Sequence, residues 1–203
     1  MRKRGSLIII SGQSGVGKGT VCKELMTIRP DLTLSISATT RKKRSTEVDG
    51  ENYYFYSQEK FEQLIEDEKL LEYALVHDRL YGTPKAFVEE HLALGDNVIL
   101  EIDVQGAAKL RNNSEEGVYI FLLPPKFSDL EDRIRNRGTE EDSEIQLRLC
   151  NAKKEIEMLK DYDYAVVNEN VSECAAMISK IIDAENHRVD KEILEKYWRE
   201  CRD

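Results

Sequence analysis

A glycine-rich run near the start of the chain, directly after an apolar segment, constrains the fold more than any other feature. Leu7-Ile8-Ile9-Ile10 is continuously apolar, and residues 12–20 read Gly-Gln-Ser-Gly-Val-Gly-Lys-Gly-Thr. A short apolar run of this kind is typical of a strand buried on both faces of a parallel sheet. Residues 20–28 then follow a helical pattern. Strand, glycine loop and helix in this order are the context in which G-x-x-x-x-G-K binds nucleotide phosphates.

The chemistry of this loop predicts a site for a nucleoside triphosphate. Glycines let the backbone turn its N–H groups toward phosphate oxygens, the helix N-terminus adds positive potential, and Lys18 brings a mobile charge. Gly19 separates the lysine from Thr20, whereas the strict pattern has Ser or Thr directly after Lys, so the hydroxyl contribution to Mg²⁺ stays open. A glycine-rich turn without a ligand is the alternative. The residues predicted to bind the triphosphate are Gly12, Gln13, Ser14, Gly15, Val16, Gly17, Lys18, Gly19 and Thr20.

Further buried-strand patterns predict a parallel sheet. They cover residues 97–103, 118–123 and 164–168, and stretches with helical spacing at 127–137 and 143–159 lie between them. Ser143 with Gln146 fits a capping box at the start of the second stretch. Strands that alternate with helices form βαβ units. We therefore expect an α/β fold, a doubly wound parallel sheet of the P-loop NTPase type with helices on both faces.

The segment from about residue 35 to 88 interrupts this alternation. It contains Thr39-Thr40-Arg41, Asn52-Tyr53-Tyr54-Phe55-Tyr56 and Tyr81-Gly82-Thr83-Pro84, which indicate a small mixed insertion on the core. Beyond residue 171 the sequence predicts one or two terminal helices, with Trp198 as the residue that docks them. A chain of 203 residues falls within the range of one domain, so we expect a single unit over residues 1–203.

Charge, cysteine content and apolar run lengths argue against several classes of function. Thirty Lys and Arg against 39 Asp and Glu leave a formal net charge of -9, which disfavours a nucleic-acid polymer but allows a local cationic cleft for small anions. The 4 cysteines are widely separated and are expected as free thiols of a reducing compartment. Neither a signal-peptide core nor an apolar run of about 18 residues is present, so no membrane partner is expected and the cytoplasm is the predicted location.

Five further segments, taken with the loop, resemble the guanylate kinase family. Gly-Lys-Gly-Thr in the loop is already similar to nucleoside monophosphate kinases, and the order and spacing of the other segments make the resemblance specific over nearly all of residues 7–168. These segments are Ser37-Ala38-Thr39-Thr40-Arg41-Lys42-Lys43-Arg44, Gly50-Glu51-Asn52-Tyr53-Tyr54-Phe55, Tyr81-Gly82-Thr83, Ile99-Leu100-Glu101-Ile102-Asp103-Val104-Gln105-Gly106, and Arg133-Ile134-Arg135-Asn136-Arg137-Gly138-Thr139 with Arg148 downstream.

The resemblance implies a reaction and an organisation. The reaction is transfer of the γ-phosphoryl group of ATP to GMP, and also to dGMP, with Mg²⁺, to give ADP and GDP in purine nucleotide metabolism. ATP and GMP are thus the implied partners. The implied organisation is a core of residues 1–37, 91–132 and 151–203, a GMP-binding region at about 38–90 and a helical lid at about 133–150.

The resemblance also assigns the GMP site. The residues that hold the phosphate of GMP match Arg41, Arg44, Tyr53 and Tyr81, and arginine forks and phenol hydroxyls suit that task. The residues that read the base match Ser37, Glu72, Thr83 and Asp103. Guanine presents N1–H and its exocyclic amine as adjacent donors beside the acceptor O6, so a carboxylate such as Glu72 can accept from both donors. Without the resemblance, Glu72 reads as a surface helix residue.

The remaining implied roles belong to charged groups around the transferred phosphoryl group. The catalytic set is Lys18, Arg41, Arg137 and Arg148. The residues that contact ATP outside the loop are Arg133 and Asn168. The candidates for Mg²⁺ are Thr20 and, through water, Asp103, and Glu101 is expected as a supporting residue.

Two other functions fit parts of these patterns. One is a guanylate-kinase-like module that binds proteins without catalysis, against which the intact loop and Lys18 argue. The other is a kinase of the same fold with a different acceptor, against which the expected base contacts argue. A homo-oligomer is compatible with the sequence and is left open.

Overall fold

The computed structural model describes residues 4–76, 78–113, 116–130, 142–189 and 191–201. Within them, a five-stranded sheet in the order β2-β7-β1-β8-β9 forms the centre, and all neighbouring strands in it are parallel. The strands predicted near residues 7, 97, 118 and 164 are confirmed, and β2 is an additional short edge strand. The bounds are β1 (Leu7–Gly12), β2 (Leu32–Leu34), β7 (Asn97–Glu101), β8 (Val118–Leu123) and β9 (Tyr164–Val167).

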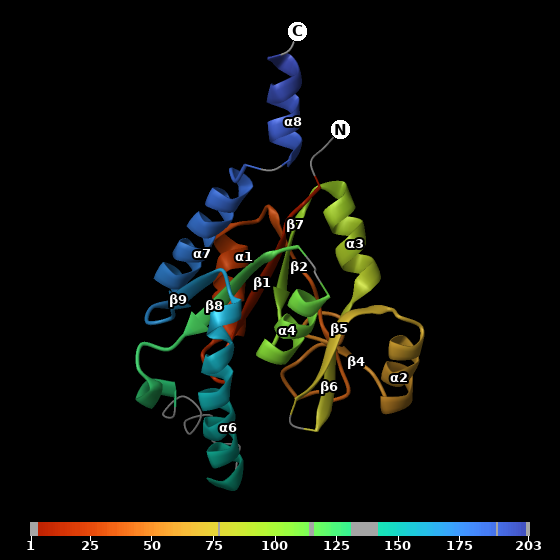
Figure 1. Cartoon of the computed structure of the whole chain (residues 1–203). Helices are drawn as coiled ribbons and strands as arrows, with labels where there is room; N and C mark the ends of the chain where they lie inside the picture. The colour runs from red at the N-terminus through yellow and green to blue at the C-terminus, as the bar shows by residue number, and fades with distance from the viewer. Residues whose placement is uncertain (1–3, 77, 114–115, 131–141, 190, 202–203) are drawn as a thin grey trace.

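Helices cover both faces of this sheet (Figure 1). Side chains alternate along β1, so Ile8 and Ile10 pack on one face while Leu7 and Ile9 pack on the other. The first face packs against α1 (Lys18–Ile28) and α7 (Val171–Asn186), and the second against α3 (Lys85–Leu94) and α4 (Val104–Asn112). The fold is therefore the predicted doubly wound α/β fold, and the loop after β1 lies at the carboxyl edge of the sheet, where ligands bind in such folds.

A second, smaller sheet forms between residues 38 and 84. Its order in the described part of the chain is β4-β3-β6-β5, with β3 parallel to β4 and antiparallel to β6, and with β5 antiparallel to β6. The predicted mixed insertion is thus confirmed. Ser57 caps the helix α2 by accepting from the amide of Lys60, and Phe61 on that helix is fully buried. The bounds are β3 (Ala38–Thr39), β4 (Tyr54–Phe55), β5 (Leu70–Val76), β6 (Arg79–Pro84) and α2 (Gln58–Glu66).

Helical segments connect β8 to β9. Residues 127–130 are helical, and the rest of the helix predicted over 127–137 lies outside the described residues. The returning segment is α6 (Asp142–Glu155), followed by the 3₁₀ helix η1 (Ile156–Asp161). The prediction that Ser143 caps α6 is wrong, because the helix already includes Asp142 and the capping-box spacing falls inside it.

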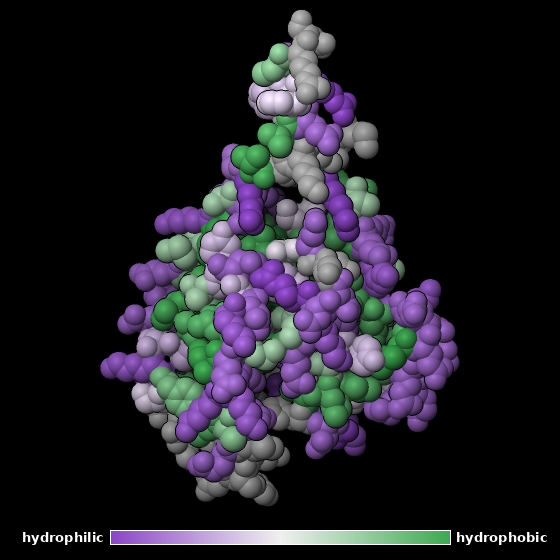
Figure 2. All heavy atoms as spheres, viewed as in Figure 1, coloured by the Kyte–Doolittle hydropathy of each residue, from purple (hydrophilic) through white to green (hydrophobic). Residues whose placement is uncertain are grey.

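The last helix, α8 (Lys191–Glu200), stands clear of the body of the molecule (Figures 1 and 2). Leu194, Tyr197 and Trp198 on it are 60%, 60% and 61% exposed. The prediction that Trp198 docks the terminal helices on the core is therefore wrong. Among the described residues of the two terminal helices, those buried in the core belong to α7: Cys174, Ala175, Ile178 and Ile182. No helix in the described ranges combines the length and the apolar character needed to cross a membrane.

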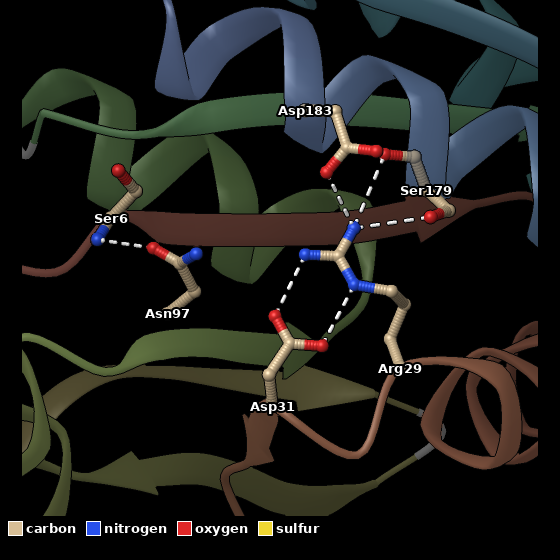
Figure 3. Close-up of polar contacts among 6 residues, drawn as sticks. All are labelled: Ser6, Arg29, Asp31, Asn97, Ser179 and Asp183. Atoms are coloured by element: carbon tan, nitrogen blue, oxygen red, sulfur yellow. Dashed lines mark hydrogen bonds and ion pairs between the residues drawn. The ribbon is translucent and has the colours of Figure 1, made fainter.

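Arg29, which follows α1, connects that helix to α7 and to the turn before β2 (Figure 3). Its Nε and Nη2 each donate to a carboxylate oxygen of Asp31 at 2.8 Å, and Nη1 donates to Asp183 at 2.8 Å and to Ser179 Oγ at 3.1 Å. Hydrogen bonding to Asp31 is the largest cause that raises the pKa of Arg29, and it lowers the pKa of Asp31. These contacts hold the helix that follows the glycine loop against its neighbour.

Candidate active site

The loop between β1 and α1 has the backbone conformation that its glycines allow. Gly12, Gly15 and Gly17 have φ angles of 145°, 87° and 99°, where a residue with a Cβ is strained. At Gly12 a Cβ would also stand 2.5 Å from the carbonyl oxygen of Leu122 on β8. Gly17 caps α1, so the loop ends at the amide groups and the positive dipole end of that helix. This arrangement suits an anion.

Lys18 is the first residue of α1 and folds back across the loop. Its Nζ donates to the carbonyl oxygen of Gly12 at 2.8 Å and to that of Gln13 at 3.3 Å. The ammonium group therefore lies over the predicted triphosphate site, and a phosphate oxygen would give it a charged acceptor in place of two neutral ones.

Two buried amide side chains brace the loop. Asn168, which follows β9, donates from Nδ2 to the carbonyl oxygen of Val16 at 2.8 Å. Gln13 donates from Nε2 to the carbonyl oxygen of Ala152 in α6, also at 2.8 Å. Both residues are among those predicted to bind ATP. In the structure, their side-chain amide nitrogens instead form hydrogen bonds that fix the backbone of the loop.

A carboxylate that the sequence analysis did not single out also reaches the loop. The backbone N–H of Ser14 donates to Oε2 of Glu155, the last residue of α6, at 3.0 Å. Loop amides are the groups expected to bind phosphate oxygens, so this contact puts a negative charge at the edge of an anion site. Nothing in the local pattern distinguishes Glu155 from the other charged residues of the helix.

A cavity of about 240 Å³ joins the loop to the second sheet. Glu47, Glu101 and Glu155 contribute acids to its wall. The predicted site residues that line it are Gly12, Ser14, Lys18, Ser37, Arg41, Arg44, Tyr53, Glu72, Tyr81 and Asp103. Thr83 reaches it through Glu72. The predicted residues that do not line it, among those described, are Gln13, Gly15, Val16, Gly17, Gly19, Thr20 and Asn168.

Arg41 is held at the cavity wall by Glu47, which the sequence analysis missed. Oε1 of Glu47 accepts from Nη2 at 2.6 Å, and Oε2 accepts from Nη1 at 3.0 Å and from the backbone N–H of Arg44 at 2.7 Å. The guanidinium carbon also lies 5.5 Å from the ring centre of Tyr53 and 5.6 Å from that of Phe55. Hydrogen bonding to Arg41 lowers the pKa of Glu47, so this pair is ionised near neutral pH.

Two phenol groups lie beside this arginine. The rings of Tyr53 and Tyr81 meet edge to face with centroids 5.9 Å apart. Burial is the main cause that raises the pKa of Tyr53 to about 12, so its hydroxyl stays protonated and can donate. Tyr53 directly precedes β4 and Tyr81 lies on β6, and both strands pair with β3, which ends just before Arg41. The second sheet thus brings the predicted phosphate-binding side chains together.

Glu72 and Thr83 face each other on β5 and β6. The Thr83 hydroxyl donates to Glu72 Oε1 at 2.7 Å, and Glu72 is only 5% exposed. A surface helix, which the local pattern alone suggests for Glu72, is therefore wrong: the residue lies in a strand. Burial is the main cause that raises the pKa of Glu72 to about 7; the charge of Asp103 adds to it and the bond from Thr83 opposes it.

Two more acids end β7 and start α4. Asp103 caps α4 by accepting from the amide of Gly106 at 2.8 Å. Burial raises the pKa values of both Glu101 and Asp103, and the charge of Lys18 opposes each shift. A Cβ at Gly19 would stand 3.3 Å from Oε1 of Glu101. A side chain after Lys18 would therefore make a tight contact with this carboxylate.

The oxygen donors in the cavity suit Mg²⁺. This ion prefers carboxylate, phosphate and water oxygens and keeps several waters, so one or two protein carboxylates are enough. Glu101 and Asp103 supply them in the cavity that also contains Lys18. Thr20 is exposed in the first turn of α1. Within the residues that the structure describes, no three His, Cys, Asp or Glu side chains form a metal-binding group.

The arginines of the predicted lid cannot be located in this site. Arg133 and Arg137 lie outside the described residues. Arg148 lies in α6, but its side chain is outside the described part of the structure. Their roles stay predictions.

Known proteins match the chain over nearly its whole length. The family model for guanylate kinase matches residues 4–185. The guanylate kinase of Clostridioides difficile (strain 630) is 49% identical over 201 residues, 98% of either chain, and that of Caldanaerobacter subterraneus subsp. tengcongensis is 50% identical over 191 residues, 94% of this chain and 93% of the relative. A crystal structure of guanylate kinase from Anaplasma phagocytophilum has a TM-score of 0.77 at 33% identity and covers 93% of this chain and 90% of that one. Because these matches span both sheets and the glycine loop, the chain belongs to the guanylate kinase family.

Proposed function

We propose that this chain is an ATP:GMP phosphotransferase, which moves the γ-phosphoryl group of ATP to GMP, and also to dGMP, to give ADP and GDP. One observation carries the proposal: a single cavity joins Lys18 of the glycine loop, Arg41 of the second sheet and the buried acid Glu72. The relatives that share about half of its residues are named guanylate kinases. Geometry and homology therefore support the same reaction.

The acceptor needs orientation more than it needs a base. A phosphate monoester has a second pKa of about 6, so the attacking oxygen of GMP is already ionised, and the protein supplies alignment and charge stabilisation. Arg41 and Arg44, with the hydroxyls of Tyr53 and Tyr81, would hold the acceptor phosphate. Lys18 would neutralise the β- and γ-oxygens of ATP.

Base recognition would rest on the carboxylate of Glu72. In its ionised form it can accept from N1–H and from the exocyclic amine of guanine, while Ser37 and Thr83 supply hydroxyls and Asp103 a second carboxylate. Adenine has an acceptor at N1 and would leave the buried carboxylate unpaired. Buried polar groups left unpaired in this way discriminate strongly between related substrates.

The bound Mg²⁺ would neutralise charge on the triphosphate and hold it in line. We assign Asp103, with Glu101 beside it, to holding the hydrated ion, and Thr20 stays a candidate at the start of α1. Their part would be to accept hydrogen bonds from the water shell.

We also propose a division of labour along the chain. Residues 38–90 would bind GMP, and residues of about 133–150 would form a lid on a core of 1–37, 91–132 and 151–203. An aligned γ-phosphoryl group must be kept from water, and closure of both regions would exclude water. The lid would carry Arg133, Arg137 and Arg148 over the transferred group.

We also propose that the protein acts in the cytoplasm. Its free cysteines, Cys22, Cys150, Cys174 and Cys201, fit a reducing compartment.

The decisive experiment measures ADP release from ATP and Mg²⁺ with one acceptor at a time: GMP, dGMP, AMP, CMP, UMP or dTMP. We expect turnover with GMP, followed by dGMP, far above that with the other four. A folded protein that is inactive with all six would contradict the proposal. Turnover with AMP or dTMP above that with GMP would replace it by another acceptor.

Lys18→Ala tests the loop. We expect kcat to fall by about 10³-fold, as for other lost charge-stabilising groups. The melting temperature should stay unchanged, because the hydrogen bonds of Lys18 within the described residues go to carbonyl groups of the loop. Lys60→Ala, on the exposed side of α2, is the matched control. A kcat near that of the unmodified protein would remove the loop from the mechanism.

A further inference from the structure

Gly106 lies in the first turn of α4, where the backbone does not require glycine. Its N–H donates to Oδ1 of Asp103, the cap of this helix, at 2.8 Å. Gly106 is not among the glycines with positive φ, so any residue could adopt its conformation. Glycine inside a helix is less favourable than alanine because it loses more conformational freedom on folding. Its presence here needs a steric explanation.

The space beside Gly106 is filled by the carboxyl group of Glu72. A Cβ at position 106 would stand 2.5 Å from Oε2 of Glu72, 3.1 Å from its Cδ and 3.2 Å from Oδ1 of Asp103. Real Cβ atoms essentially never approach another atom within 3.0 Å. A side chain at this position would therefore force either the carboxyl group or the helix to move.

Neither of them moves freely. The carboxyl group of Glu72 is buried, and its other oxygen accepts from Thr83 at 2.7 Å. The helix is tied to the same strand, because Nζ of Lys109 donates to the carbonyl oxygen of Tyr73 and lies 4.2 Å from the centre of the Tyr73 ring. Glu72 and Tyr73 are adjacent on β5. Retreat of α4 would stretch the contact between Lys109 and Tyr73, and rotation of the carboxyl group would break the hydrogen bond from Thr83.

We propose that Gly106 is a specificity-determining position for the acceptor base, because its missing side chain sets where the Glu72 carboxylate lies. This inference rests on the proposed role of Glu72 toward guanine. The carboxylate is held between the Thr83 hydroxyl and the first turn of α4, and the same turn presents Asp103. A Cβ at position 106 displaces Oε2, so the two adjacent donors of guanine no longer meet both carboxylate oxygens at hydrogen-bond distance.

The steric part is tested without any nucleotide, by a double-mutant cycle in thermal unfolding. Gly106→Ala is made in the natural sequence and in Glu72→Ala, which lacks the carboxyl group. We expect the alanine to lower the melting temperature clearly more in the natural sequence than in Glu72→Ala, where the better helix propensity acts and only the 3.2 Å contact with Asp103 Oδ1 remains. Equal shifts in the two backgrounds would overturn the inference.

The specificity part is tested by kinetics with GMP and with IMP, which lacks the exocyclic amine but keeps N1–H and O6. We expect Gly106→Ala to raise KM for GMP about tenfold, to leave KM for ATP unchanged, and to reduce the preference for GMP over IMP about fivefold. Gln105→Ala, an exposed change in the same turn, is the control and should keep the preference.

The outcomes separate this inference from the proposed function. If the unmodified protein does not phosphorylate GMP, the proposed function fails and the specificity claim fails with it, whatever the unfolding cycle shows. If the unmodified protein phosphorylates GMP but Gly106→Ala keeps both its KM for GMP and its preference over IMP, only the inference about Gly106 is overturned.

Discussion

Among single residues, Glu72 should make the stability of the protein depend on pH. Its pKa is about 7 in the folded chain against an ordinary value of 4.5. The folded state therefore binds this proton more tightly than the unfolded state does. The resulting stabilisation is complete below about pH 4.5 and is lost as the pH rises through about 7. The difference between the two pKa values corresponds to on the order of 3 kcal/mol.

Glu72→Gln should remove this dependence, because glutamine keeps the size of the side chain and carries no proton that titrates. We measure the free energy of unfolding with urea at about pH 5 and about pH 8. Between these two pH values, we expect the unmodified protein to lose about 2.5 kcal/mol of stability relative to the variant. Glu62→Gln, exposed on α2, controls for the loss of a carboxylate. A difference from the unmodified protein that is the same at both pH values would contradict the prediction.

Glu47 should act through Arg41. It holds both Nη groups of that guanidinium and the backbone of Arg44, so Glu47→Gln removes the charged partner and one of the two acceptors. We expect KM for GMP to rise about tenfold while KM for ATP stays unchanged, in steady-state assays with the other substrate saturating. Glu51→Gln, exposed in the same turn region, is the control. A lower KM for GMP would mean that Glu47 instead competes with the acceptor phosphate.

The residues of the site were predictable to different degrees. The loop residues follow from spacing and glycine chemistry, because the backbone conformation at Gly12, Gly15 and Gly17 demands glycine. Glu72 could be found only by resemblance, since its burial depends on pairing with β6, whose strand pattern is not evident locally, and on the space at Gly106, which is distant in sequence. Glu47 and Glu155 gave no signal. A solvated acid and an acid bound to an arginine or a loop amide look the same in a sequence.

Among the elements, α6 should influence the affinity for ATP. Its last residue, Glu155, accepts from the amide of Ser14, so a carboxylate lies where the negative triphosphate is expected. Glu155→Gln removes that charge and keeps an acceptor oxygen. We expect KM for ATP to fall several-fold with KM for GMP unchanged, and Glu157→Gln, exposed in η1, to have no effect. A rise in KM for ATP would show instead that the carboxylate organises the loop.

The elements themselves were predictable where their burial is continuous. β1, β7, β8 and β9 read as apolar runs because helices cover both faces of the sheet. β2, β3 and β4 are three, two and two residues long, too short for any period to show. The prediction that Trp198 docks on the core failed for another reason. The sequence spacing of apolar residues in an amphipathic helix is the same whether the helix packs on the core or, like α8, stands clear of it.

At the scale of the whole molecule, the net charge is opposite in sign to the three cations of the site. The chain carries -9, whereas Lys18, Arg41 and Arg44 line one cavity together with five acidic residues. Raising the salt concentration from about 0.01 M to about 0.1 M shortens the Debye length from about 30 Å to about 10 Å. This screens the long-range repulsion of nucleotides but leaves short contacts in the cavity largely intact.

We therefore expect kcat/KM for GMP to rise by up to several-fold over this range of potassium acetate, with little change in kcat. Arg41→Lys should have a lower kcat/KM for GMP at every salt concentration in this range. Its kcat/KM should rise with salt by the same factor, because the substitution leaves the net charge of the protein unchanged. A falling kcat/KM would contradict this prediction and indicate that Lys18, Arg41 and Arg44 attract the nucleotides more strongly than the net charge repels them.

The braces of the glycine loop have a consequence for how the protein is made. They join Gln13 to Ala152, Ser14 to Glu155 and Val16 to Asn168, partners that are 139, 141 and 152 positions apart. On the ribosome, the loop therefore emerges long before the residues that hold it. A nascent chain that has not reached residue 168 contains the phosphate-binding sequence without all the contacts that hold its shape, so we expect the capacity to bind a triphosphate to arise only after that residue is made.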